Sequence, residues 1–386
     1  HNFWSNNITV KSASAEMNGV PITDTTPLVV SSSTFTGYAT KATTKPASSS
    51  LDLDNDESNK HLQTLTNDGA TIKNTPQYES RAGTEARDEL KQLVNLAVPV
   101  IGTYLLEMLP GVVSTVLVGH IDSDAVEEYI DATTLAVTIF NLCGCSIGFG
   151  LATAMDTLCS QAYGAGNIGR MGDYFQTGCL VLSMVILVIG MAIYYTKDIL
   201  IYLGQPVIVS ELAGQFSLIL LAGLPFLFLF ELLKKVLQAQ NLPMAMLWSA
   251  VAANVINIGL GYVFVYHTSM GWLGAAFART LSAIGATLIL VGYMYIHDLI
   301  TPFWSGLHIG RAVKGMKEFI SLGVPGMLQL VFEWWAFELL ALISGVLPNP
   351  VVSIGANSLL LQISSMTYMI YLGISISGNV RIGNAL

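Results

Sequence analysis

Long uncharged stretches of apolar residues dominate the sequence after about residue 90. A helix that crosses a bilayer needs roughly 20 mostly apolar residues without a charge at its centre. Eight stretches meet this requirement and predict eight membrane-spanning helices: Val94–Val118, Ala132–Met155, Tyr174–Thr196, Leu212–Phe230, Met244–Tyr266, Leu273–Ile296, Phe319–Val346 and Ser353–Val380. A soluble domain would have to bury uncharged stretches of 43 residues (236–278) and 42 residues (339–380) in its core. We therefore expect an all-α polytopic membrane protein.

The first 83 residues have the opposite character. They are rich in Ser and Thr, contain the acidic stretch 52–57 and have few large apolar side chains. Such a segment cannot bury enough apolar surface to offset the entropy lost when a chain becomes ordered. We expect residues 1–83 to form a disordered tail, residues 84–300 to hold six spanning helices, and residues 301–386 to hold a linker and two more helices.

Composition narrows the classes of function. Charged residues make up 11% of the chain, against about 25% in an ordinary soluble domain. The net charge is −9 and there is no basic cluster, so we do not expect nucleic acid as a partner. The four cysteines lack metal-ligand spacing, and the sequence contains no nucleotide-binding glycine loop and no hydrolase motif. We expect no metal, no cofactor, no enzymatic activity and no ATP-driven transport.

The distribution of Lys and Arg between the predicted loops indicates the orientation of the chain, since cytoplasmic loops hold an excess of both. Basic residues precede the first span and follow the second, fourth, sixth and eighth spans: Arg81, Arg87, Lys91, Arg170, Lys234, Lys235, Arg311, Lys314, Lys317 and Arg381. The loops on the other side hold Lys197 as their only basic residue, and the loop after the first span is acidic. We predict a cytoplasmic N-terminus, in the plasma membrane or in a vacuolar or other organellar membrane.

The seventh span repeats the pattern of the first. Pro99 aligns with Pro325, and a glutamate follows each proline by eight residues, at Glu107 and Glu333. Three further pairs of positions align: Gly150 with Gly373, Asp156 with Asn379, and Gln161 with Asn384. Transporters are commonly built from such duplicated units. Spans one to six are thus predicted to form one lobe, and spans seven and eight to begin a second lobe whose other four helices would follow Leu386.

Four motifs resemble the signature of the multidrug and toxic compound extrusion (MATE) transporters, in their eukaryotic branch: Val118–His120, Gly148–Asn167, Glu333–Glu338 and Val380–Asn384. The resemblance covers residues 93–386, with the motifs in the family's order. It implies a twelve-helix exporter of two six-helix lobes that exchanges small organic molecules, often cations or xenobiotics, for protons or sodium ions. By the same comparison, this sequence lacks the last four helices.

Two glutamates inside the seventh span are candidates for coupling transport to protons. An ionisable side chain within a span is costly and marks a functional site, and removal from water favours the protonated form of a carboxyl group. Glu333 and Glu338 lie about 140° apart around a helix, so one can line a cavity while the other reaches a neighbouring helix. The resemblance implies a role in cation coupling for Glu333. For Glu338, coupling and a structural hydrogen bond are equally open.

Glu107, midway along the first span, is the third coupling candidate. It can form a second proton site in the first lobe, or it can be a protonated and hydrogen-bonded structural group. Bacterial members of the family carry an Asp lower in this helix, where this sequence has Ser114 and Thr115, so we expect protons rather than sodium ions. Asp156 and Gln161 belong to the family motif but lie near a helix end, where a structural role is favoured.

Aromatic and amide side chains mark the predicted substrate cavity. Trp334 and Trp335 can stack on an organic cation, a contact worth about 0.5–2 kcal/mol, and their depth in the span argues against interfacial anchoring. Asn141, Gln329 and Gln362 can bind substrate or join helices. Some animal exporters of organic cations have Glu at the position of Gln362, so the resemblance does not carry a preference for cations to this sequence.

Arg279 stands apart as a cation inside the sixth span. It lies about 10 Å from the predicted outer end of the span, at 1.5 Å per residue. It can extend its head group outward to the interface or pair with an acidic side chain.

Together these patterns predict a monomeric secondary antiporter that exports small organic substrates in exchange for protons. A flippase for lipid-linked sugars on a related two-lobe scaffold is the alternative, and a more basic cavity than these acidic spans would favour it. A seven-helix receptor would need an outside N-terminus and an odd number of spans, and the loop charges oppose both.

Overall fold

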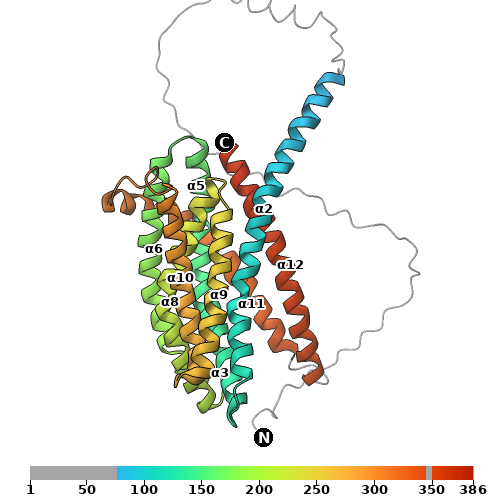
Figure 1. The fold of residues 1–386 in the computed structure, drawn as a ribbon, viewed down its shortest axis with the longest axis vertical. Coiled ribbons are helices and arrows are strands. Elements are labelled where there is room, and N and C mark those ends of the chain that lie inside the picture. Colours follow the sequence, from blue (N-terminus) through green and yellow to red (C-terminus); the bar gives the residue numbers. More distant parts are fainter. Residues whose placement is uncertain (1–75, 345–349, 386) are drawn as a thin grey trace, which may run out of the picture. The chain divides into compact units, whose positions relative to one another are not determined.

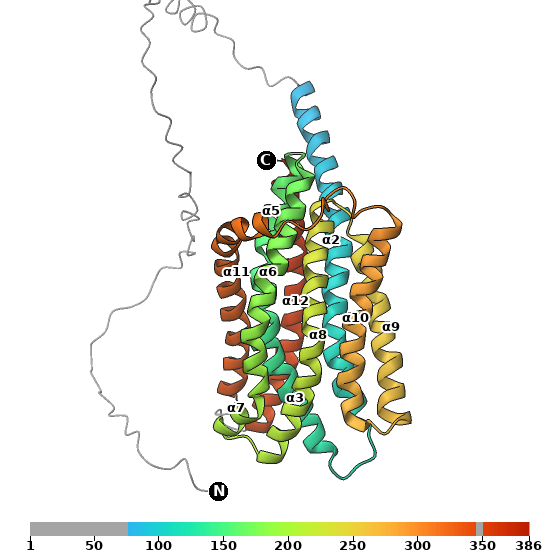
Figure 2. The ribbon, with the colours of Figure 1, turned by 90° about the vertical axis from the view of Figure 1, so that its left-hand side faces the viewer.

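The computed structural model describes the backbone of residues 76–344 and 350–385 and most side chains from Arg87 onward; the side chain of Gln362 lies outside this description. In this part of the chain every regular element is a helix (Figures 1 and 2). The predicted all-α fold class is confirmed. Of the predicted tail, residues 1–75 lie outside the described residues, and the first described helix begins at Pro76, before the boundary expected at residue 83.

The first two crossings of the bundle are α2 (Pro76–Gly119) and a segment divided into α3 (Val126–Ile139), the π-helix η1 (Phe140–Cys145), α4 (Ser146–Ala152) and α5 (Ala154–Gly164). Further elements of the first lobe follow: α6 (Ile168–Tyr194), the short α7 (Thr196–Tyr202), α8 (Val207–Ala239), α9 (Met244–His267), the 3-10 turn η2 (Gly271–Leu273) and α10 (Gly274–Ile296). A linker then leads to α11 (Ile309–Ser344) and α12 (Pro350–Ala385).

Seven helical segments of the described residues are long and apolar enough to cross a membrane, and they coincide with the first seven predicted spans. They are Arg87–Gly119, Val126–Gly164, Ile168–Tyr194, Val207–Ala239, Met244–His267, Gly271–Ile296 and Ile309–Glu338. The eighth predicted span, Ser353–Val380, lies within α12, several of whose side chains are outside the description. Large apolar side chains such as Leu187, Val188 and Val255 are exposed on the bundle, as a bilayer environment requires.

The fourth span extends farther than its apolar pattern predicts. The sequence placed Lys234 and Lys235 in a basic loop, but α8 continues to Ala239 and both lysines are buried inside it. The loop assignment of this pair is therefore wrong. The physical reason is that acidic partners on three helices neutralise the two ammonium groups, so the helix does not have to end where the charges begin.

Helix α8 forms much of the interior of the first lobe. It packs against α3, α5, α6, α7 and α10. Phe216, Leu224 and Val236 are spread along its length and have no exposed surface. Large side chains of the surrounding helices pack with them in one continuous apolar cluster. The charged side chains near the end of this helix, Glu231, Lys234 and Lys235, are therefore buried in closely packed surroundings.

The two repeated segments contact each other through equivalent positions. Helix α4 packs against α11, and α2 packs against α12. A Cβ atom at Gly150 would lie 2.4 Å from Met327 Cα, and one at Gly373 would lie 2.4 Å from Ile101 Cγ1. Gly150 aligns with Gly373 at an offset of 223, and Ile101 with Met327 at an offset of 226. These paired close approaches support the repeat, although the lobe boundaries themselves remain predictions.

Candidate functional site

Glu333 lies in the middle of α11 and contacts the second helix of its own segment. The phenol hydroxyl of Tyr368, on α12, donates a hydrogen bond of 3.1 Å to Glu333 Oε2. The side chain is partly buried. Among the residues that the structure describes, no Lys, Arg or His forms an ion pair with this carboxylate. A phenol hydroxyl is a neutral hydrogen-bond donor, so this contact does not compensate a charge on Glu333.

The other predicted residues of α11 lie on different sides of the helix. Glu338 is partly buried and has no hydrogen bond or ion pair within the described part of the chain. Trp334 packs against the apolar cluster of the first lobe, whereas Trp335 is 51% exposed. Gln329 is exposed on the same helix. The two tryptophans therefore do not form one face: one joins the lobe, and the other is available to a ligand or to lipid.

Two further cavity candidates, Asn141 and Gln362, and the motif residue Gln161 lie on other helices than Glu333. Asn141 is partly buried in η1, the π-helix that interrupts the second crossing. Gln161 is exposed near the end of α5. Gln362 belongs to α12, but its side chain lies outside the described residues. The predicted substrate residues thus remain hypotheses of the sequence.

A buried ion cluster lies inside the first lobe. Lys234 Nζ is 2.6 Å from Glu107 Oε1 and 2.6 Å from Glu231 Oε2. Lys235 Nζ is 2.9 Å from Asp156 Oδ2 and 3.6 Å from Glu231 Oε1. Three of these side chains come from one stretch of α8, at positions i, i+3 and i+4, which place them on one face of the helix. Helices α2 and α5 each add one carboxylate to that face.

Tyr104, one turn before Glu107 on α2, contacts both lysines of the cluster. Its ring faces Lys234 Nζ at 4.5 Å, and Lys235 Nζ donates a hydrogen bond of 3.3 Å to its hydroxyl oxygen. Phe230 offers a second ring, 5.5 Å from Lys234 Nζ. Buried ammonium groups need this many partners, because an unpaired charge in such a place costs several kcal/mol.

The cluster has one more carboxylate than it has ammonium groups. Among the described residues, Glu107, Glu231 and Asp156 form ion pairs with Lys234 and Lys235 alone. Asp156 Oδ1 is buried without a hydrogen-bond partner, whereas the Glu107 side chain keeps 23% of its surface exposed. Glu107 is therefore the most exposed side chain of the cluster. Lys234 binds Glu107 at 2.6 Å, whereas no described base forms an ion pair with Glu333.

Sequence reasoning missed most of this cluster. It identified Glu107 and Asp156 separately, it read the two lysines as loop residues, and it did not consider Glu231 at all. The available signal was the spacing of one glutamate and two lysines at i, i+3 and i+4 directly after an apolar run.

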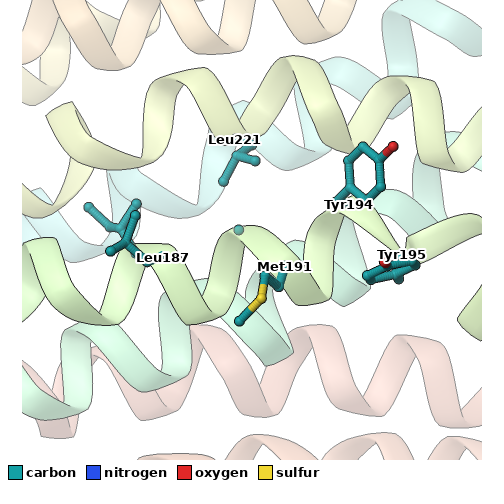
Figure 3. Close-up of a pocket in the computed structure, with 7 residues that line it drawn as sticks. Leu187, Met191, Tyr194, Tyr195 and Leu221 are labelled. Carbon is teal, nitrogen blue, oxygen red and sulfur yellow. The ribbon is translucent and has the colours of Figure 1, made fainter.

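An apolar groove lies on the described surface, and none of these residues lines it. It has a volume of about 450 Å³ between α6 and α8, and Figure 3 shows Leu187 and Met191 facing it together with Leu221. Tyr194 and Tyr195 border it. The side chains of Leu187 and Met191 are among the exposed apolar residues of the bundle. Its position suits contact with lipid chains, and none of the predicted site residues lines it.

A smaller, charged groove of about 240 Å³ lies where α6 meets the start of α11. Arg311 Nη1 is 3.3 Å from Asp173 Oδ2, and Arg170 Nη2 is 3.9 Å from Glu318 Oε2. These exposed pairs join the first lobe to α11 at the end of the bundle where α6 and α11 begin (Figure 2).

Comparison with known proteins agrees with this architecture. Residues 99–263 match the MatE family model. Multidrug and toxin extrusion protein 1 of Oryctolagus cuniculus is 35% identical over 300 residues, which cover 78% of this chain and 52% of the relative. The Homo sapiens protein of the same name is 34% identical over 300 residues, covering 78% and 51%. This chain thus spans about half the length of the curated relatives it matches.

Solved structures show the same fold. The crystal structure of the eukaryotic MATE transporter AtDTX14 superposes with a TM-score of 0.71 at 31% identity, covering 77% of this chain and 65% of that one. A MATE structure in the bent conformation gives 0.64 at 17% identity, covering 74% and 63%, and shows the fold alone. The described residues form a multi-pass α-helical membrane protein with the fold of these structures. Over the matched residues the chain belongs to the multidrug and toxic compound extrusion family, as the sequence motifs indicated.

Proposed function

We propose that this chain acts in secondary antiport, exporting small organic substrates in exchange for protons. The relatives' names, multidrug and toxin extrusion protein, support export of organic compounds. Family membership does not identify the coupling ion, so the coupling group has to be argued from the carboxylates inside the spans.

The observation that carries the proposal is the environment of Glu333. It is a partly buried carboxylate inside a span, and its described polar partner is a neutral phenol, Tyr368. A lysine at ion-pair distance favours the charged form of a carboxylate and so opposes the uptake of a proton. A carboxylate beside a phenol can alternate between charged and neutral forms as the cavity opens to either side.

Glu333 is the first of the three candidates for the glutamate that exchanges protons. Glu338 comes second, because it shares the absence of a described base but lies about 140° farther round the helix. Glu107 comes last, because Lys234 holds it at 2.6 Å.

Trp335 and Gln329 are the proposed substrate contacts of α11, since both are exposed on the helix that carries Glu333. An aromatic face and an amide suit an organic molecule with a polar or cationic group. We propose that the chain acts as a monomer in this exchange.

We also propose a cytoplasmic N-terminus. With Lys234 and Lys235 removed from the loop count, exposed basic residues remain in the first parts of three helices: Arg87 and Lys91 in α2, Arg170 in α6, and Arg311, Lys314 and Lys317 in α11. Figure 2 shows these three helices beginning at the same end of the bundle. Lys197 is the basic residue predicted for the opposite side, where the loop after α2 is acidic. The excess of Lys and Arg favours that basic end as the cytoplasmic one.

The test compares Glu333→Gln with the matched control Glu318→Gln in proteoliposomes. Both variants remove one carboxylate from α11, but Glu318 is exposed at the helix start. Uptake of a labelled quaternary ammonium compound is measured with an imposed pH gradient. We expect Glu333→Gln to lose the gradient-driven component and Glu318→Gln to retain it. Equal gradient-driven uptake in both variants, at equal amounts of folded protein, would refute the role of Glu333.

A further inference from the structure

Helices α11 and α12 are buried against the first lobe at one end of the bundle. Among the described side chains of α11, those that are buried all lie in its first half: Ala312, Phe319 and Gly323. Those of α12 all lie in its second half: Gly373, Ile376, Ser377, Val380 and Gly383. Figure 2 shows that α11 begins and α12 ends at the same end of the bundle. Glu333 lies in the other half of α11, where no described side chain is buried.

The end of α12 meets α5 through very small residues. A Cβ atom at Gly383 would lie 2.7 Å from Ser160 Cβ, and one at Gly164 would lie 2.8 Å from Asn384 Cα. Gly383 and Ser160 are equivalent positions of the two repeats, at the offset of 223 noted above. Small residues let two backbones approach closely without interlocking large side chains. This contact can therefore part without repacking a core.

Two polar side chains at this end of α12 are only partly satisfied. Arg381 Nη2 lies 2.6 Å from Glu89 Oε2 of α2, and Asn384 Nδ2 donates a hydrogen bond of 3.2 Å to Ala239 O of α8. Arg381 Nε and Asn384 Oδ1 are buried and have no hydrogen-bond partner within the described part of the chain. A buried polar atom without a partner costs free energy that contact with water would recover. The closed contact therefore carries a penalty that favours its release.

The apolar contacts of the two helices differ in the same sense. Ile376 and Val380 of α12 belong to a small cluster with Leu96 of α2, apart from the main core of the first lobe. Phe319 of α11 and Phe303 of the linker before it are buried within that main core. The start of α11 is thus part of the core of the lobe, whereas the end of α12 is attached beside it.

Hydrogen bonds also fix the linker and the start of α11 to α6. Gln176 is buried; its Nε2 donates a hydrogen bond of 2.9 Å to Gly306 O, and its Oε1 accepts one of 2.7 Å from His308 N. The next residue, Thr177, donates a hydrogen bond of 3.1 Å from Oγ1 to Ala312 O, in the first turn of α11. Two neighbouring side chains of α6 therefore hold the backbone on both sides of the point where α11 begins.

We propose that residues 380–385 form a gate at the end of α12, which parts from α2, α5 and α8 while the linker and the first turns of α11 stay on α6 as the hinge. The inference rests on the proposed exchange, in which Glu333 has to meet the two sides of the membrane in turn. The structure has the gate closed at the end where α11 begins. Release of the gate opens a path from that end to Glu333.

The first test compares two cross-links at the same end of the bundle. Glu89→Cys with Arg381→Cys spans the gate and is joined by a short bifunctional thiosulfonate reagent, since the native side chains meet at 2.6 Å. Thr177→Cys with Gly315→Cys spans the hinge. A Cβ at Gly315 would lie 3.7 Å from Thr177 Cβ, within the range of about 3.5–4.5 Å that a disulfide needs. Mass spectrometry measures how complete each cross-link is.

Gradient-driven uptake of the labelled quaternary ammonium compound is measured in each protein before cross-linking, after it and after reduction. We expect the gate cross-link to abolish uptake and dithiothreitol to restore it, whereas the hinge disulfide should leave uptake unchanged. The single-cysteine variants, treated in the same way, control for the four native cysteines. Uptake that survives a complete gate cross-link would overturn the proposal, as would a hinge disulfide that blocks uptake.

The second test does not depend on transport. Spin labels are placed in pairs at Gly169 with Gly310, across the hinge, and at Gly169 with Gly378 of α12; a Cβ at each of these glycines meets no atom within 4 Å. Cys143→Ser and Cys179→Ser remove the two native cysteines that are not buried. Distances are measured by electron spin resonance at acidic and alkaline pH, with and without the quaternary ammonium compound.

We expect one narrow distance between Gly169 and Gly310 in every condition. Between Gly169 and Gly378 we expect a second, longer distance whose share changes with pH or substrate. A Gly169–Gly378 distance as constant as the hinge distance would overturn the gate, and a hinge distance that changes equally would overturn the hinge. If the reduced protein showed no gradient-driven uptake while the Gly378 distance still changed, the proposed antiport would fail and the gate would stand.

Discussion

Lys234→Met tests whether the buried ion cluster stabilises the first lobe. The lysine has no exposed surface and makes two contacts of 2.6 Å, to Glu107 and Glu231. Methionine keeps much of the length and the apolar stem but removes the charge. The cluster then holds three carboxylates against one ammonium group instead of two, so its net charge changes from −1 to −2.

Removing one partner of a buried ion pair typically costs about 3–5 kcal/mol, because the other partner is left as an uncompensated charge. At roughly 2–4 °C per kcal/mol, the unfolding midpoint in detergent should fall by about 6–20 °C. Lys197→Met is the matched control. Its side chain is 43% exposed and pairs with Glu211 at 3.0 Å, so its loss should cost about 0–1 kcal/mol.

The double variant Lys234→Met with Glu107→Gln checks the charge argument. It leaves two carboxylates and one ammonium group, which restores the net charge of −1. We expect it to unfold at a higher temperature than Lys234→Met alone. A fall in midpoint no larger in Lys234→Met than in Lys197→Met would refute the reasoning, as would a double variant less stable than the single one.

Two further predictions concern packing and topology. A Cβ at Gly150 would lie 2.4 Å from the backbone of α11, whereas one at Gly259 meets no atom within 4 Å. Gly150→Ala should therefore lower stability by about 1–3 kcal/mol, and Gly259→Ala should raise it by about 0.5–1 kcal/mol. Thermal unfolding of both variants measures this, and a stabilising Gly150→Ala would contradict the close approach of the helices. A cysteine at Ser123 should react with an impermeant thiol reagent in intact cells, and one at Gly310 only after permeabilisation. The opposite pattern of labelling would invert the proposed orientation.

The sequence pattern alone predicted the membrane-spanning helices well. Because charge is costly inside a bilayer, each spanning helix appears in the sequence as a long uncharged apolar stretch. The first seven predicted spans fall on helices of the structure. The repeat was also visible, since the alignment of Pro99 with Pro325 depends only on spacing. Its consequence in three dimensions, the paired contacts of Gly150 and Gly373, was not, because a close approach depends on how two distant helices meet.

The candidate site was harder to predict, because burial and pairing are properties of several helices at once. Lys234 and Lys235 look like loop residues when each charge is taken as solvated, and only the positions of Glu107 and Asp156 show that they are not. Arg279 was recognised as unusual, and among the described residues its Nη1 atom has no hydrogen-bond partner while its guanidinium faces the Phe140 ring. The sequence named Glu333 and could not show that a phenol, rather than a base, faces it.

Proton movement driven by substrate tests the central claim most directly. Proteoliposomes containing the wild-type chain and a pH-sensitive dye are loaded with a quaternary ammonium compound and diluted into medium without it, at equal starting pH. If the chain exchanges organic substrate for protons, the outflow of substrate should acidify the interior, and Glu333→Gln should abolish the acidification. Outflow of substrate at a normal rate with no change of internal pH in the wild type would contradict proton-coupled exchange.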